Sequence, residues 1–79
     1  MRMFPYYCRD EKYRVAVKWN KRKSKNFYYR HIGFSGVEFI KNPKIAHTCS
    51  SRENAESLIE YLQRRIKEAG FLLRENINH

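Results

Sequence analysis

Apolar residues recur at intervals of three and four between positions 50 and 70, which is the spacing of one face of an α-helix. The stripe consists of Ala55, Leu58, Ile59, Leu62, Ile66 and Ala69. Ser50 and Glu53 have the spacing of a capping box, and Gly70 suits the left-handed residue that often follows a helix. The pattern therefore predicts one amphipathic helix over residues 51–69, and its apolar face needs a partner.

Apolar and polar residues alternate from Lys12 to Asn20, which predicts a strand with one buried face. That face carries Tyr13, Val15, Val17 and Trp19. Residues 27–34 are also rich in strand formers, but Phe27 and Tyr29 compete with the other large residues for the inner face, so its orientation stays open. A turn signal at Ser35-Gly36 precedes a third predicted strand, residues 37–40, which ends before Pro43.

The remaining segments have weaker patterns. Residues 4–8 are aromatic and fit either an edge strand or an arm across the core. Residues 45–49 predict a short extended stretch before the helix. After Gly70, residues 71–73 are apolar enough to fold back on the core or add a strand, whereas we expect 74–79 to fray.

A chain of 79 residues has room for one core and one domain. The order of elements predicts an α+β fold, in which an antiparallel sheet of three or four strands packs against one C-terminal helix and its other face remains in water. The expected core is Tyr13, Val15, Val17, Trp19, Ile32, Phe39, Leu58, Ile59, Leu62 and Ile66.

The net charge of +9 is unevenly distributed, because residues 1–50 hold 12 Lys or Arg against 3 acids while residues 51–70 hold 4 against 4. Such an excess favours a polyanionic partner. Six cations lie between positions 18 and 30 with no acid among them, and we call residues 18–30 the basic segment. Cations at this density neutralise phosphates, and interleaved tyrosines can stack on unpaired bases.

The candidate nucleic-acid-binding residues are therefore Arg14, Lys18, Lys21, Arg22, Lys23, Lys25, Tyr28, Tyr29 and Arg30. Two other interpretations stay open: a solvated hairpin whose charges protect a sheet edge, and a surface for an acidic protein.

Catalytic and metal-binding patterns are weak. Cys8, His31, His47 and Cys49 are ligand-type residues, but their spacings match no zinc module, and the cysteines are expected as packed or free thiols. No carboxylate pair, nucleophile elbow or glycine-rich phosphate loop occurs, so we expect a non-enzymatic protein without cofactor. No run approaches signal-peptide or membrane-span length, which favours a cytoplasmic protein without a membrane partner.

The stretch from Tyr13 to Tyr61 resembles the small domains of three strands and one helix at the N-termini of phage and transposon tyrosine integrases. The similarity lies in the alternating basic and aromatic hairpin and in the strand-to-helix junction at residues 45–56. Because those domains bind DNA through the sheet, the resemblance implies a nucleic-acid partner, with DNA favoured over RNA. Phage proteins of this build also include inhibitors of host factors. The alternative is therefore a phage-type inhibitor or regulator of an acidic host protein, such as an anti-CRISPR protein contesting a nucleic-acid path.

Overall fold

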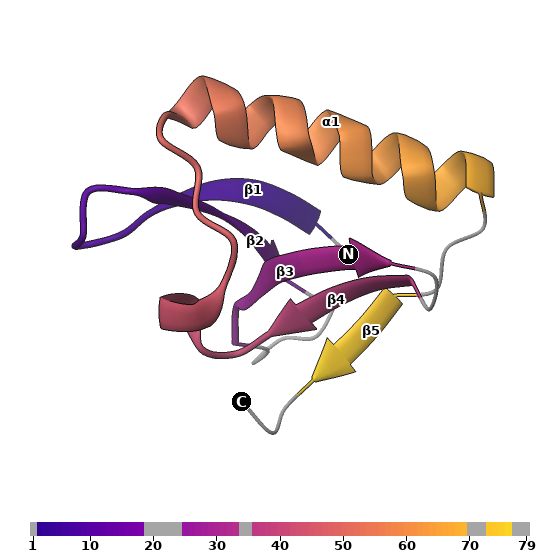
Figure 1. The fold of residues 1–79 in the computed structure, drawn as a ribbon, viewed down its shortest axis with the longest axis horizontal. Helices are drawn as coiled ribbons and strands as arrows, with labels where there is room; N and C mark the ends of the chain where they lie inside the picture. Colours follow the sequence, from indigo (N-terminus) through magenta and orange to yellow (C-terminus); the bar gives the residue numbers. More distant parts are fainter. Residues whose placement is uncertain (1, 19–24, 34–35, 70–72, 77–79) are drawn as a thin grey trace.

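The computed structural model describes residues 2–18, 25–33, 36–69 and 73–76. Within these ranges the elements are β1 (Arg2–Tyr7), β2 (Tyr13–Lys18), β3 (Phe27–Gly33), β4 (Gly36–Ile40), η1 (Pro43–Ile45), α1 (Arg52–Ala69) and β5 (Leu73–Asn76). Helix α1 lies along one face of the sheet and contacts β1 and β2 (Figure 1). None of the helices in the described ranges combines the length and apolar character that crossing a membrane requires.

The strands form one sheet in the order β1-β2-β3-β4-β5. Strands β1 to β4 pair antiparallel, as their short connections predict, so the predicted α+β fold with one C-terminal helix is confirmed. Of residues 4–8, all but Cys8 belong to the edge strand β1, so the edge-strand alternative is correct for them. Strand β5 pairs parallel to β4 after the chain returns through α1, and it includes residues 74–76, which we expected to fray.

The main core lies between α1 and the sheet. Its buried members are Met3, Val15, Val17, Phe27, Tyr29, Val37, Phe39, Ile59 and Leu62, with Ile32, Leu58 and Ile66 partly buried against them. Two residues of the predicted core are not among these. Tyr13 is half-buried at the rim, with its ring centroid 5.0 Å from that of Tyr7, and Trp19 lies outside the described residues.

A bulge in β3 explains why its hydrophobic pattern is ambiguous. Tyr29 pairs with Phe39, whereas the next pairing joins His31 to Glu38, so β3 has one extra residue at Arg30. The side chains of Phe27 and Tyr29 face α1 before the bulge, and the shift returns Ile32 to the same core after it. An alternation rule without the bulge places Ile32 on the wrong face.

The second face of the sheet is not left in water as expected. Phe4, Ala16, Tyr28 and Ile40 form one row across four strands, since each is the register partner of the next. Ala16 and Ile40 are fully buried, and Ala46, which follows η1, packs into the same cluster. The expectation fails because residues 43–46 cover part of this face, and a sequence pattern does not reveal that long-range contact.

The segment after η1 enters the sheet between β2 and β3. These strands share only the pairs Ala16–Tyr28 and Val17–Phe27. Farther along, the Tyr13 and Cys49 backbones exchange hydrogen bonds of 2.9 and 2.7 Å, and the His47 N–H donates to the Tyr29 carbonyl at 3.0 Å. Residues 47–49 thus fill the gap where β2 and β3 diverge, and they lead directly into α1.

The helix cap lies one residue later than predicted. Ser51 Oγ accepts from the backbone N–H of Asn54 at 3.1 Å, and its carbonyl accepts the first helical bond, from Ala55, so Ser51 is the N-cap. Ser50 Oγ accepts from the Asn54 side-chain amide at 2.8 Å. The helix therefore begins at Arg52, and the predicted capping box of Ser50 with Glu53 is wrong.

Candidate nucleic-acid interface

The face of the sheet opposite α1, here called the distal face, carries alternate residues of each strand. Strand alternation and register assign to it Arg2, Phe4, Tyr6, Arg14, Ala16, Lys18, Tyr28, His31, Glu38 and Ile40. The apolar row forms its centre. Cationic and aromatic residues lie toward its two ends.

One end of the distal face is cationic. Arg2 and Lys18 are register partners on neighbouring strands, and both are exposed. The Arg2 guanidinium lies 5.0 Å from the ring centroid of Phe4, so the apolar row supports it by a cation–π contact. Because the basic segment begins at Lys18, this end joins the part of the chain with the densest positive charge.

The predicted phosphate contacts have different surroundings. Lys21, Arg22 and Lys23 lie outside the described residues, whereas Lys18 and Lys25 are exposed. The Arg30 side chain is 39% exposed, and its Nε lies 3.8 Å from Glu38 Oε1, so an acid partly offsets its charge. Lys18 and Lys25 are thus the cations of the basic segment that the structure places on the surface without a described ion pair.

Arg14 belongs to the fold and not to a free basic surface. It is only 4% exposed, and its Nη1 and Nη2 atoms donate to the two carboxylate oxygens of Asp10 at 2.9 and 2.8 Å. Its Nε–H donates to the Pro43 carbonyl. The hydrogen bonds with Asp10 raise the pKa of Arg14 and hold the pKa of Asp10 below its usual range. Since its guanidinium is occupied, we leave Arg14 out of the phosphate-contacting set.

The two predicted stacking residues are both buried. Tyr29 faces α1, with its ring 6.3 Å from Phe39 and 5.6 Å from His47. Tyr28 lies on the distal face at 8% exposure, and its ring meets that of Tyr6 edge-on at 5.7 Å. Burial raises the pKa of both tyrosines. Both rings are therefore largely covered, whereas Tyr6 is 39% exposed.

A cleft that sequence analysis missed lies at the other end of the distal face. Its volume is about 440 Å³, and it opens between the β1–β2 turn and η1, which lie at the same end of the molecule (Figure 1). It is lined by Tyr6, Tyr7, Cys8, Arg9, Asp10, Arg14, Tyr28, Pro43 and Lys44. The sequence feature that could have indicated this cleft is Tyr6-Tyr7-Cys8-Arg9. Only the fold brings Lys44 beside these residues.

The β1–β2 turn shapes one wall of this cleft. The Cys8 N–H donates to the Lys12 carbonyl and the Glu11 N–H to the Cys8 carbonyl, both at 3.0 Å. Glu11 adopts a left-handed conformation with φ of 65°. Asp10 Oδ1 accepts from the Lys12 N–H at 3.1 Å, which holds the carboxylate in place for Arg14.

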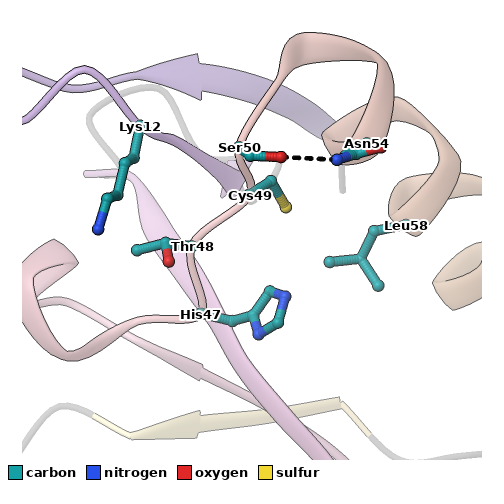
Figure 2. Close-up of a pocket in the computed structure, with 7 residues that line it drawn as sticks. All are labelled: Lys12, His47, Thr48, Cys49, Ser50, Asn54 and Leu58. Carbon is teal, nitrogen blue, oxygen red and sulfur yellow. Dashed lines mark hydrogen bonds between the residues drawn. The ribbon is translucent and has the colours of Figure 1, made fainter.

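A second hollow lies at the start of α1 and is shown in Figure 2. It is lined by Lys12, His47, Thr48, Cys49, Ser50, Asn54 and Leu58. The His47 ring and Cys49 sulfur point to the side of Leu58, away from Lys12 and Thr48. Burial raises the pKa of the Cys49 thiol, which disfavours the thiolate needed by a nucleophile or metal ligand. No group of three or more His, Cys, Asp or Glu residues suited to a metal occurs in the described part of the chain.

Comparisons with protein-family models, with curated proteins and with solved structures find no match for this chain.

Proposed function

We propose that the protein binds nucleic acid, with DNA favoured over RNA, through the distal face and the basic segment, and that it acts by binding without catalysing a reaction. The observation that carries the proposal is the exposed pair of Arg2 and Lys18 at the end of the distal face, where the basic segment begins. A polyanion that lies there can contact Arg2 and Lys18 and also the other cations of the basic segment. The integrase domains that the sequence resembles bind DNA through their sheet, which supports the sheet as the binding surface here.

Charge-matched double variants test this proposal. If Arg2 and Lys18 both touch phosphates, changing both to Ala makes the slope of log affinity against log salt shallower by about 2 units on duplex DNA. The control changes Arg64 and Lys67, two exposed cations on α1, to Ala and removes the same charge elsewhere. Fluorescence anisotropy across a salt titration measures both slopes. Equal losses from the two double variants would show attraction by net charge alone and would contradict the proposed interface.

An alternative partner is favoured by exposed apolar side chains at the cleft end. Tyr7 is 57% exposed and Ile45 44%, and they lie in the same region as Arg9 and Lys44. Tyrosine and arginine are enriched among residues that dominate protein interfaces. An inhibitor of an acidic host protein would use such a surface.

Affinity purification from lysate with and without nuclease separates the two functions. Partners lost after nuclease treatment support nucleic-acid binding, and one stoichiometric protein that remains bound supports the inhibitor.

A further inference from the structure

Building on the proposed function, we propose that the cleft between the β1–β2 turn and η1 receives one unpaired nucleobase, so that the protein prefers DNA with an unpaired nucleotide to continuous duplex. The cations at its rim would then hold the flanking phosphates. This makes the cleft a base-binding site that the sequence pattern does not indicate.

The cleft is held in shape before any ligand enters. Arg14 joins its two walls, since it donates to Asp10 in the β1–β2 turn and to the Pro43 carbonyl of η1. A volume of about 440 Å³ lies in the range of sites that hold small organic groups. Because the cleft is open to solvent, a base can enter while its sugar and phosphates remain outside.

The aromatic lining matches a base. Tyr6 is 39% exposed, and its edge-on contact with Tyr28 fixes the ring at an interplanar angle of 65°. A ring fixed in this way loses little freedom when a base stacks on it. Tyr7 also contributes to the lining, while its ring lies beside that of Tyr13, at 5.0 Å between centroids.

The exposed cations of the lining can hold the phosphates that flank the base. The Asp10 carboxylate is paired with Arg14 inside the cleft, so neither charge of that pair is free for a ligand. Arg9 and Lys44 are exposed lining residues and can pair with phosphates outside.

The distance along β1 fits one continuous strand of nucleic acid. Arg2 and Tyr7 are five residues apart, which corresponds to about 16 Å in a β-strand. A single strand can therefore contact Arg2 and Lys18 and place a base in the cleft a few nucleotides later. A continuous duplex must first unstack and unpair a base, which lowers its affinity relative to a bulged duplex.

Three fluorescein-labelled DNAs test the inference: a short strand of mixed sequence, its perfect duplex, and that duplex with one unpaired nucleotide. The parent protein should bind the bulged duplex and the single strand more tightly than the perfect duplex. Tyr6→Ala should weaken binding to those two DNAs roughly 5- to 100-fold and should weaken binding to the perfect duplex by a much smaller factor. The control Tyr61→Ala removes a tyrosine of similar exposure, 44%, from α1 and should change none of the three.

A second readout keeps the test independent of overall affinity. With 2-aminopurine at the unpaired position, stacking on Tyr6 should quench its fluorescence in the parent complex, and Tyr6→Ala should restore it. Tyr6→Ala binding all three DNAs like Tyr61→Ala, or a parent that prefers the perfect duplex, overturns the cleft assignment. If binding still depends on Arg2 and Lys18 in that case, the proposed function stands without the cleft. A parent that binds none of the DNAs at low salt overturns both.

Discussion

At the scale of the residue, Arg14 shows how the fold changes the use of a charge. In the sequence it is one more cation near the basic segment, and only the turn at Cys8–Lys12 brings Asp10 within reach of it. A buried guanidinium must be paired, and here three of its nitrogens donate hydrogen bonds within the protein. The residue predicted to contact phosphate therefore joins the two walls of the cleft.

This pair gives stability a defined dependence on pH. The folded state lowers the pKa of Asp10, so its contribution is present above the ordinary pKa of about 3.9 and is lost as the pH falls through the folded value. Asp10→Asn should therefore lower the melting temperature at neutral pH, and the difference from the parent should shrink below about pH 4. Circular dichroism melts across pH measure it. The control is Glu11→Gln, which removes the neighbouring acid. If it lowers the melting temperature as much as Asp10→Asn, the ion pair with Arg14 is not the cause.

At the scale of the element, local periodicity predicted what depends on local contacts. The stripe of α1 from Ala55 to Ile66 and the placement of Val15 and Val17 toward α1 were both correct. The expectation that β2 has only one buried face was wrong, because Arg14 and Ala16 are buried on the other side. The bulge at Arg30, the entry of residues 47–49 between β2 and β3, and the cover that Ala46 gives to the distal face were missed. Each of these arises from contacts between distant parts of the chain. The cleft was missed for the same reason, because its walls are about thirty residues apart in the sequence.

Leu62 tests how much the packing of α1 on the sheet contributes to stability. Leu62 has no exposed surface and lies in the main core, so Leu62→Ala should lower the free energy of unfolding by roughly 2 to 5 kcal/mol. Gln63→Ala changes an exposed neighbour on the same helix and should shift it by less than about 0.5 kcal/mol. Urea denaturation followed by circular dichroism compares the two. A midpoint unchanged by Leu62→Ala would contradict the two-layer core.

At the scale of the whole molecule, positive charge and the helix are separated. Residues 1–50 hold 12 Lys or Arg against 3 acids, whereas residues 51–70 hold 4 of each. On α1 some of these charges pair locally, as in the contact of Arg52 with Glu56 at 3.8 Å. The excess therefore belongs to the strands and the basic segment. A field with this asymmetry orients an approaching polyanion toward them and away from the outer surface of α1.

The basic segment gives the corresponding prediction for the whole chain. Changing Lys21, Arg22 and Lys23 to Ala should make the salt slope for duplex DNA shallower by about 2 to 3 units if all three touch phosphates. If the same DNA also contacts Arg2 and Lys18, the five substitutions together should reduce the slope by about 4.5 units, at about 0.9 for each contact. Changing Arg52, Arg64 and Lys67, three exposed cations of α1, to Ala matches the charge lost in the triple variant and controls for net charge. The urea midpoint checks that each variant is folded. A triple variant that binds duplex and single strands like its parent across the titration would leave the basic segment as a solvated surface, and the acidic-protein partner would then be the better hypothesis.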